Sequence, residues 1–438
     1  MKSTPITFGQ KISVVSVASI GVTLEWYDFF AAGTAAALVF PKYFFPVGLP
    51  PVLAILYSYV TFLIGFLGRP VGALIFGHIG DRLGRRVGLA ADLLLMGLAS
   101  LAIGFTPGYA DIGYLGVVLV SIFRFIQGMA IGGEWGGAAA LVQEFFAESK
   151  KRAFWGSWVQ QGVPFGALLA NGIFTLVAIW YPGQAFINFG WKIVFWIGGA
   201  AALAGVILRL IILETPLFER LRANGAVARS PIIETFKNFW KEVLLLAVAR
   251  GGENANYYVF TVYSITFLTG IGMARALSTL GVTIASAVEI IAILIAALLA
   301  DRIGRRAVLV TGNIAIVIYA VPYVLLLFLF KGTDLFFYSA AIALSIFAII
   351  HGFMYAAQPA YWSELFPTKY RYTATGTAYH LTAIIAGGLA PIIITSIVGT
   401  DFLGKWWGQS IVIAAYALFS ILAYYALRET KATEPLPH

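Results

Sequence analysis

The sequence predicts an all-α membrane protein in which twelve transmembrane helices form two six-helix bundles. Its 438 residues are 60% hydrophobic and only 11% charged, whereas an ordinary soluble domain carries about 25% charged residues. The apolar residues fall in runs of about 20, the helix length that crosses a hydrocarbon core of about 30 Å. They do not alternate with polar residues as in the short strands of an outer-membrane barrel. Lipid is therefore the expected solvent for most of the surface.

Twelve apolar segments account for the predicted helices. They cover residues 12–40, 52–77, 87–106, 113–146, 154–179, 191–213, 242–269, 277–300, 307–330, 334–357, 375–399 and 406–427. The first segment is too long, and carries too many acids, for a cleavable signal peptide, so we expect it to be a retained span. An even number of spans places both termini on the same side.

Basic residues in the loops predict which side that is. Twenty lysines and arginines fall on the side of the termini, against four on the other side, namely Lys42, Arg275, Lys331 and Lys405, with Lys192 near that face. Cytoplasmic loops carry the excess of Lys and Arg, so both termini should be cytoplasmic and the chain should lie in the inner membrane. The net charge of +9 then reflects topology, and no nucleic-acid partner is expected.

An internal repeat divides the chain. Asp81-Arg-Leu-Gly-Arg-Arg86 recurs as Asp301-Arg-Ile-Gly-Arg-Arg306, 220 residues later, and the same offset relates Glu144 to Glu364. Parallel repeats of this kind relate the halves of some transporters. We therefore expect an N-terminal bundle over residues 1–213, a polar cytoplasmic loop over 214–241, and a C-terminal bundle over 242–438.

These motifs resemble a known family. The Asp-Arg-x-Gly-Arg-Arg loops after the second and eighth spans are similar to the signature loop of the major facilitator superfamily. Four further stretches are similar to motifs of its metabolite:proton symporter branch: Glu25-Trp-Tyr-Asp-Phe-Phe30, Arg69-Pro-Val-Gly72, Gly77-His-Ile-Gly-Asp81 and the stretch from Arg124 to Gly137. Three others are similar to elements of sugar porters: Glu214-Thr-Pro216, Glu364-Leu-Phe-Pro367 and Glu429-Thr-Lys431. The resemblance implies proton-coupled symport by alternating access. That branch carries carboxylates, shikimate and zwitterionic osmolytes, so a small organic acid is the first expectation, and a sugar or zwitterionic osmolyte is the alternative.

Ionisable residues inside the spans are the candidates for function, because a charge at the bilayer centre is costly. They are Glu25, Asp28, Arg69, Arg124, Glu134, Arg250, Glu253 and Glu289. Glu25 and Asp28 lie three residues apart on one helix face, so they should either meet arginines or hold a proton. The resemblance implies that Asp28 is the proton site and Arg124 its partner, with Glu25 capping or pairing with Arg69. The alternative is a static Asp28–Arg124 ion pair that only aligns two spans.

A polar face on the seventh span predicts substrate contacts. Arg250, Glu253, Asn254 and Tyr257 recur there at helical spacing beside a Gly-Gly pair. Arg250 could bind a substrate carboxylate through two parallel hydrogen bonds; alternatively, Arg250 and Glu253 neutralise each other. Further candidates for the substrate cavity are Arg69, Gln160, Gln161, His380, Tyr355 and Gln358. His351 and Trp362 lie on the same span as Tyr355, and packing is their alternative role. For Glu134 and Glu289, the two alternatives are a second proton site and a structural role.

The repeated basic loops predict a cytoplasmic gate. By resemblance, their arginines bind the carboxylates of Glu144 and Glu364 and hold the outward-open state; the alternative is a set of basic loops that only determine topology. The gate residues are Asp81, Arg82, Arg85, Arg86, Glu144, Asp301, Arg302, Arg305, Arg306 and Glu364.

Several classes of protein are not expected. The chain has no cysteine, which excludes disulfides and a thiol nucleophile, and it has neither a Walker loop nor a His-Glu-x-x-His motif. We expect no catalytic residue, metal or cofactor, and a functional monomer whose partners are a small solute, protons and lipid. A membrane-embedded enzyme or a channel is the competing class.

Overall fold

The computed structural model of the chain describes residues 8–83, 85–211, 231–366, 368–431 and 434. Within these ranges, the side chains of some residues, including 77–80, 81–89, 144 and 368–373, lie outside the description. The described residues form helices and connecting turns, without a strand.

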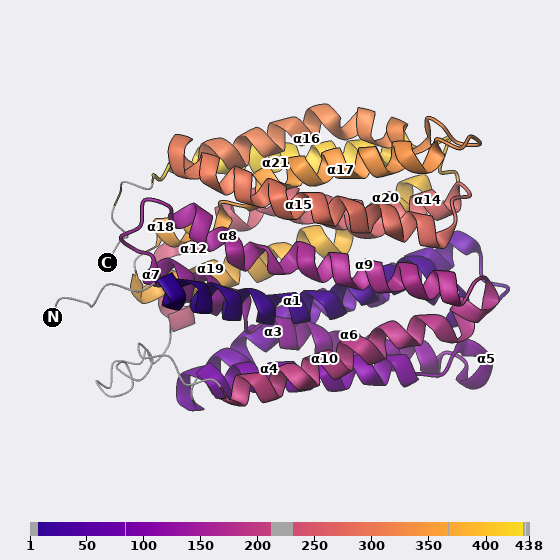
Figure 1. The fold of residues 1–438 in the computed structure, drawn as a ribbon, viewed down its shortest axis with the longest axis horizontal. Coiled ribbons are helices and arrows are strands. Elements are labelled where there is room, and N and C mark those ends of the chain that lie inside the picture. The colour runs from indigo at the N-terminus through magenta and orange to yellow at the C-terminus, as the bar shows by residue number, and fades with distance from the viewer. Residues whose placement is uncertain (1–7, 84, 212–230, 367, 432–433, 435–438) are drawn as a thin grey trace.

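The helices run along the long axis of the molecule (Figure 1). Those of the N-terminal half are α1 (Phe8–Leu38), α2 (Phe40–Tyr43), α3 (Pro51–Leu83), α4 (Arg85–Phe105), α5 (Tyr109–Ile112), α6 (Leu115–Ile131), α7 (Trp135–Phe145), α8 (Arg152–Gln160), α9 (Gly162–Trp180), η1 (Phe186–Gly190) and α10 (Trp191–Ile211). Those of the C-terminal half are α12 (Pro231–Ala249), α13 (Gly251–Tyr258), η2 (Val259–Tyr263), α14 (Ser264–Gly270), α15 (Arg275–Ile303), α16 (Arg305–Phe328), α17 (Phe336–Tyr355), α18 (Gln358–Leu365), α19 (Thr368–Thr382), η3 (Ala383–Gly388), α20 (Leu389–Val398) and α21 (Trp407–Ala426).

The lengths and composition of these helices fit a membrane. In the described part of the chain, eight helical segments are long and apolar enough to cross a bilayer, and two shorter apolar helices cover Ala90–Phe105 and Leu115–Ile131. The remaining two spans are α1 and the run from α12 to α14, which carry buried charges that lower their hydropathy. Together with the ten apolar segments, they confirm the prediction of twelve spans.

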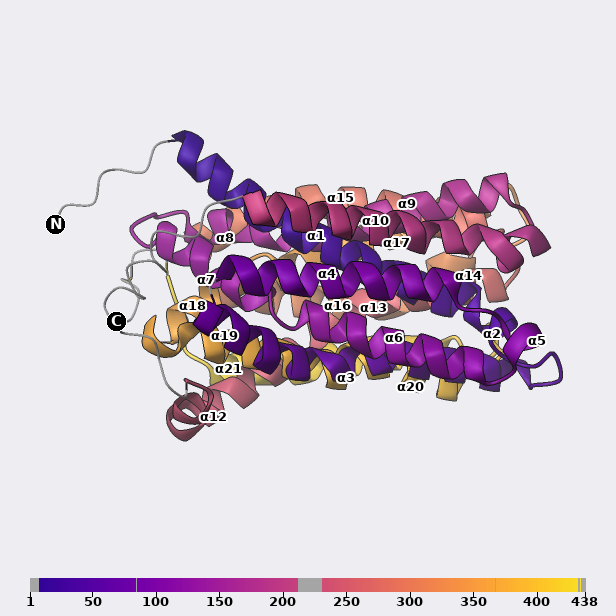
Figure 2. The same ribbon diagram turned by 90° about the horizontal axis from the view of Figure 1, so that it is seen from below.

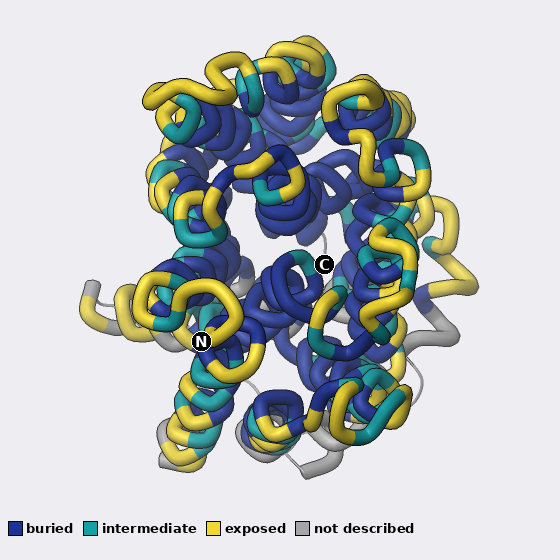
Figure 3. The backbone as a smooth tube through the Cα atoms, turned by 90° about the vertical axis from the view of Figure 1, so that its right-hand side faces the viewer, coloured by how far each residue is buried: buried dark blue, intermediate teal, exposed yellow. Residues whose placement is uncertain are grey.

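Burial is distributed as expected for a protein in lipid. Buried residues face the spaces between helices, whereas exposed residues lie on the outer surface (Figure 3). Many of the exposed side chains are large and apolar, for example Ile318, Leu422 and Phe419, which are 72%, 67% and 63% exposed. In water such a surface would be an interaction patch, but in a bilayer it faces the acyl chains.

Small residues allow the closest helix contacts of the N-terminal half. A Cβ built on Gly128 of α6 would lie 1.7 Å from the carbonyl oxygen of Gly65 on α3, and one on Gly72 would lie 1.7 Å from that of Met129. Only glycine fits at such backbone-to-backbone contacts, which are typical of transmembrane helix pairs. These contacts place α3 and α6 side by side and thereby position Arg69 and Arg124.

The predicted loop over 214–241 is wrong in its last third. Helix α12 begins at Pro231, a residue type favoured in the first turn of a helix because it has no N–H to leave unpaired. Polar residues such as Lys237 and Lys241 made this segment look like a loop, but they occupy the exposed face of the helix. Figure 2 shows α12 at the same end of the molecule as α8 and α18.

We call that end the basic end, defined by Arg152, Asp301, Arg305 and Glu364, and the other end the opposite end. Both ends join the two halves directly. At the opposite end, the Tyr59 hydroxyl lies 2.6 Å from that of Thr266, and the Thr175 hydroxyl lies 2.8 Å from that of Thr279.

Candidate functional site

Two buried arginines occupy the centre of the molecule. Arg69 projects from α3 and Arg124 from α6, and neither is exposed at all. The guanidinium carbon of Arg69 lies 4.2 Å from the centre of the Phe29 ring and 4.5 Å from that of Phe66. Arg124 approaches the same Phe29 ring at 4.7 Å. Cations are attracted to the faces of aromatic rings, so this cage holds both guanidinium groups within an otherwise apolar space.

The hydrogen bonds of these arginines are incomplete. Arg69 Nη2 donates to the Tyr258 hydroxyl at 3.4 Å, and Arg124 Nη1 donates to Gln127 Oε1 at 2.5 Å. Gln127 in turn donates to the Ser100 hydroxyl. Nε and Nη1 of Arg69, and Nε and Nη2 of Arg124, have no partner, and no carboxylate of the described residues forms an ion pair with either arginine.

Unsatisfied buried cations indicate a site for an anion. Most buried polar groups in proteins are hydrogen-bonded, so a group without a partner needs an explanation. Two guanidinium groups with free N–H donors match the fork geometry of a carboxylate. These donors and the positive charge of the two guanidinium groups are not matched by any carboxylate of the described residues.

Asp28, the predicted proton site, lies beside this pair. Its carboxylate is 1% exposed, and a Cβ on Gly198 of α10 would clash with its Oδ1. It interacts electrostatically with Arg124 and with the Ser100 hydroxyl. The predicted direct Asp28–Arg124 ion pair is not formed in the described residues, because Arg124 turns toward Gln127. A static ion pair between the two spans is therefore not what this structure shows.

Glu25 lies in a different cluster from the one expected. It does not pair with Arg69, which turns toward Tyr258. Instead, Glu25, Asp92 and Glu134 each place one carboxylate oxygen within 4.8 Å of the other two. Three buried carboxylates this close can share protons or hold a cation. Each of them also interacts with a further group, so the cluster is not an open set of ligands.

On the seventh span, the structure shows the internal ion pair that was the alternative to a substrate contact. Arg250 Nε lies 3.0 Å from Glu253 Oε2, and Gln358 donates to the same carboxylate oxygen at 3.1 Å. Arg250 also donates to the carbonyl of Tyr379 at 3.0 Å and lies 3.5 Å above its ring. Arg250 and Gln358 thus both bind the Glu253 carboxylate, while Gln358 Oε1 has no hydrogen-bond partner.

Four other predicted substrate residues are buried near the centre. Asn254 Oδ1, the hydroxyl oxygens of Tyr257 and Tyr355, and His380 Nδ1 make no hydrogen bond. The Tyr257 ring lies 5.4 Å from that of Phe30 on α1, which places it where the two halves meet. Asn254 and His380 stay candidates for polar substrate contacts.

The two predicted glutamines lie at the contact between the halves. Gln160 accepts from Trp135 Nε1 at 2.9 Å and donates to the Tyr355 carbonyl at 3.2 Å, and Gln161 donates to the Ile290 carbonyl at 3.0 Å. Trp135 itself stacks on Tyr379, with ring centres 3.9 Å apart. In this arrangement the NH2 groups of both glutamines are bound to the other half, whereas Gln161 Oε1 has no partner.

The basic end contains a buried charge cluster from both halves. Arg305 lies 3.1 Å from both Asp301 and Glu364, and Arg152 of α8 lies 2.9 Å from Glu364. Asp301 accepts hydrogen bonds from the backbone N–H groups of Ala153 and Phe154, where the positive end of the α8 dipole favours an anion. The second signature loop therefore contacts the N-terminal half.

The rest of the predicted gate is less centrally placed or not described. Arg306 donates to the Leu427 carbonyl at 2.7 Å and lies 3.9 Å from Glu429, and Arg302 is exposed. The side chains of Asp81, Arg82, Arg85, Arg86 and Glu144 lie outside the described residues.

Comparison with known proteins identifies the family. The sequence model of the Major Facilitator Superfamily matches residues 30–391. The chain belongs to the major facilitator superfamily. It is 34% identical to the inner membrane metabolite transport protein YhjE of Escherichia coli over 98% of this chain and 96% of that protein, and 33% identical to the E. coli shikimate transporter over 94% and 93%. These relatives place it in the metabolite:proton symporter branch.

Solved structures of the superfamily share its fold. The proton:xylose symporter XylE bound to 6-bromo-6-deoxy-D-glucose superposes with a TM-score of 0.72 and 18% identity, covering 97% of each chain. A partially occluded, inward-open XylE from E. coli also reaches 0.72, with 16% identity over 96% and 98%. These structures share the fold, and the family match and the sequence relatives identify the protein as a multi-pass membrane transporter and not an enzyme.

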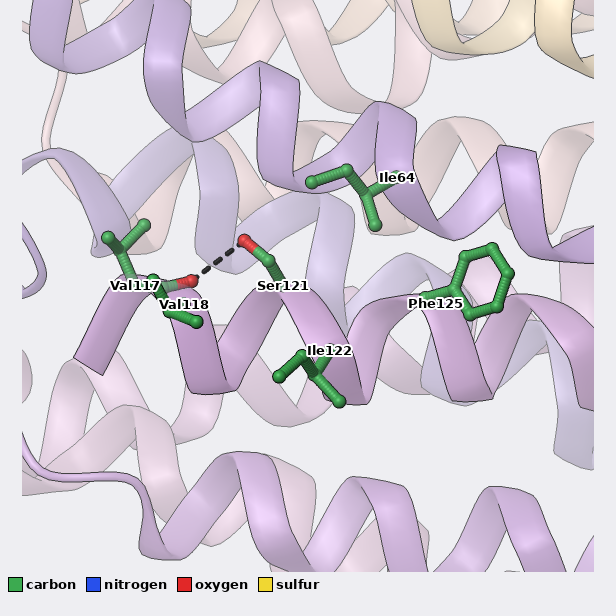
Figure 4. Close-up of a pocket in the computed structure, with 6 residues that line it drawn as sticks. All are labelled: Ile64, Val117, Val118, Ser121, Ile122 and Phe125. Carbon is green, nitrogen blue, oxygen red and sulfur yellow. Dashed lines mark hydrogen bonds between the residues drawn. The ribbon is translucent and has the colours of Figure 1, made fainter. Parts of the chain in front are cut away.

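Not every hollow of this transporter is a solute site. A pocket of about 390 Å³ lies between α3 and α6 and is lined by Ile64, Val117, Val118, Ser121, Ile122 and Phe125 (Figure 4). Its one polar side chain, Ser121, already donates to the Val117 carbonyl at 2.7 Å. An apolar lining without a free polar group suits a lipid chain better than a charged metabolite.

Sequence reasoning missed four residues of these sites. Gln127 follows Arg124 by three positions on one helix face, so its contact could have been anticipated. Asp92 lies inside the predicted third span and belonged among the buried charges. Tyr258 ends the polar stretch of the seventh span, yet only its neighbours were proposed. Arg152 was counted only as a loop cation.

Proposed function

We propose that this transporter imports a small organic acid together with protons, by alternating access, in the cytoplasmic membrane with both termini in the cytoplasm. The observation that carries the proposal is the pair Arg69 and Arg124, buried in one aromatic cage with free N–H donors and no carboxylate partner among the described residues. A carboxylate solute would supply the missing acceptors. Each chain contains both halves, so a monomer can complete the cycle.

Asp28 is the residue we assign to the proton. It is buried beside Arg124 without forming an ion pair in the described residues. A carboxyl group in such a place is stable only if it is neutral or if a cation turns to it. Gain or loss of a proton at Asp28 would therefore decide whether Arg124 is held by Asp28 or is free for the solute.

The basic end is the gate in this proposal. Arg152, Arg305, Asp301 and Glu364 join the halves there through buried, charge-assisted hydrogen bonds, which must break before the solute can leave to the cytoplasm. The signature loops thus act as a latch in addition to determining topology.

A zwitterionic osmolyte is the second candidate. Proline/betaine transporters are among the relatives, for example that of E. coli, 29% identical over 99% of this chain. The aromatic cage of Phe29, Phe66 and Tyr258 could hold a quaternary ammonium group, but two guanidinium groups already lie against it. This crowding favours an anion.

A thermal-shift screen on the purified full chain tests the substrate class, because a ligand that binds only the folded state stabilises it. The panel contains shikimate, di- and tricarboxylates, glycine betaine, proline and xylose. We expect carboxylates to raise the melting temperature and Arg69→Gln to weaken their binding by about tenfold to a hundredfold, since a hydrogen bond to a charged group contributes about 1.5–3 kcal/mol.

The matched control is Lys331→Gln, which removes a positive charge at an exposed position of the opposite end and should leave binding as it was. Stabilisation by betaine or xylose alone, or carboxylate binding that Arg69→Gln does not weaken, would overturn the organic-acid assignment.

A further inference from the structure

A chain of four ionisable side chains lies buried within the C-terminal half, away from Asp28. Arg250 and Glu253 come from the α12–α13 column, Glu289 from α15 and His351 from α17, and none is more than 2% exposed. Arg250 Nε lies 3.0 Å from Glu253 Oε2, Glu253 Oε1 lies 3.4 Å from His351 Nε2, and His351 Nδ1 lies 2.5 Å from Glu289 Oε1. The imidazole therefore stands between two carboxylates.

When both carboxylates of this chain are ionised, its charge and its contacts favour a proton on the ring. A neutral imidazole has one N–H and can donate to only one carboxylate, whereas the imidazolium ion donates from both nitrogens. With a neutral ring, one guanidinium and two carboxylates leave one net negative charge in the interior; with imidazolium the cluster is neutral. An uncompensated buried charge is strongly destabilising.

We propose that His351 and Glu289 form a second proton-binding site, in the C-terminal half, whose proton is taken up and released during the transport cycle. Its ligand is a single proton held between two carboxylates. Asp28, in the N-terminal half, is a separate site.

Among the described residues, the surroundings of the site supply no other counter-charge. From the α12–α13 column, the groups that face it are Glu253, Arg250 and Tyr257, and the Tyr257 ring lies 4.5 Å from that of His351. Tyr355 of α17 lies 5.5 Å from the same ring, and Gln358 of α18 binds Glu253. In the described residues, no titratable side chain of α8, α9 or α16 forms a hydrogen bond or an ion pair with Glu289 or His351.

The site is connected to the contact between the halves. Glu253 binds His351 through one carboxylate oxygen and Arg250 through the other. Arg250 lies 3.5 Å above the Tyr379 ring, and that ring stacks on Trp135 of the N-terminal half at 3.9 Å. When His351 loses its proton, Arg250 is the remaining cation of the cluster and faces the charges of both Glu253 and Glu289. The net charge next to the stacked rings of Tyr379 and Trp135 then changes. This link to the movement of the halves rests on the alternating access proposed above; the occupancy of the proton site does not.

Histidine NMR tests the occupancy without any solute. The full chain, labelled with ¹⁵N-histidine and placed in lipid nanodiscs, has four histidines, and the His351→Gln spectrum identifies the signal of His351. We expect an imidazolium ring at pH 7 in the wild type and a neutral ring in Glu289→Gln. A neutral ring in the wild type, or a ring state that Glu289→Gln does not change, would overturn the site.

One further variant keeps this measurement interpretable. Asp334→Asn removes an exposed carboxylate of the opposite end and should leave the His351 signal as it is in the wild type. With a neutral ring, Glu289→Gln leaves one guanidinium and one carboxylate, Arg250 and Glu253, which balance each other, so this variant should remain monodisperse. If it does not fold, the wild type decides by itself, because a neutral His351 ring at pH 7 overturns the site.

A distance measurement tests the link to the halves, again without solute. Spin labels at Glu148→Cys and Ile303→Cys report opening of the basic end, in an Asp28→Asn background that removes the first proton site. Between pH 6 and pH 9 we expect the ratio of open to closed molecules to change about tenfold, and less than about twofold once Glu289→Gln is added. An equal change in both proteins would show that this proton does not bias the halves. Because no substrate is present, neither result depends on whether the solute is an organic acid.

Discussion

Arg152 donates from Nε to Glu364 Oε1 at 2.9 Å and thereby joins the two halves at the basic end. Both side chains are buried, with exposures of 2% and 4%. Arg152 also donates to the carbonyls of Ala147, Lys431 and Glu434, and Glu364 is shared with Arg305. One arginine thus holds the N-terminal half, the α18 helix and the C-terminal tail together.

Arg152→Gln should open the basic end. Breaking a buried ion pair by removing one partner is destabilising by about 3–5 kcal/mol. Arg305 alone then faces both Asp301 and Glu364, so the cluster keeps one uncompensated negative charge. The label pair at Glu148→Cys and Ile303→Cys should then move apart, and electron–electron distance measurement reads this directly. The chain has no native cysteine, so the labels are specific. If the distances at both ends stay at their wild-type values, the pair is not a gate.

Loss of the two hydroxyl pairs at the opposite end should open that end and leave the basic end closed. Tyr59→Phe with Thr175→Val removes the hydrogen bonds to Thr266 and Thr279, each contributing about 1 kcal/mol. We expect labels at Gly48→Cys and Lys331→Cys to separate and the basic-end labels to stay together. An opening of both ends at once would contradict alternating access.

Asp28→Asn should uncouple transport from the proton gradient. The amide keeps the size of the side chain but cannot take up a proton, so accumulation driven by a pH gradient should be lost while exchange of solute across the membrane continues. Flux assays in liposomes measure both, with Asp334→Asn as the control for loss of a carboxylate. Wild-type accumulation in Asp28→Asn would rule out Asp28 as the proton site.

Gly128→Ala should destabilise the N-terminal half. Its Cβ would lie 1.7 Å from the Gly65 carbonyl oxygen, and because the clash is with backbone, α3 and α6 must separate. Overpacking costs typically about 1–3 kcal/mol, so the melting temperature of the purified protein should fall and Arg69 should lose its position. Gly376→Ala, whose Cβ would meet nothing within 4 Å, should be neutral or stabilising by about 0.5–1 kcal/mol. Similar melting temperatures for the two variants would contradict the close approach.

The sequence alone predicted the twelve spans, because the requirement for about 20 apolar residues is local and can be read along the chain. It also identified the buried charges, since a charged residue within an apolar run is conspicuous wherever the run folds. The internal repeat of 220 residues also related the two signature loops to each other.

The partners of those charges were decided only by the tertiary structure. Asp28 and Arg124 were expected to pair, yet Arg124 donates to Gln127 on its own helix, and Gln127 in turn donates to Ser100 of α4. Arg250 and Glu253 were compatible with either a ligand site or an internal pair, and the position of Tyr379 and Gln358 around them gives the pair. Arg69 and Arg124 share one aromatic cage only because Gly65, Gly72 and Gly128 let their helices touch. Helix rotation, tilt and depth depend on packing between distant segments, and a sequence pattern along one helix does not contain them.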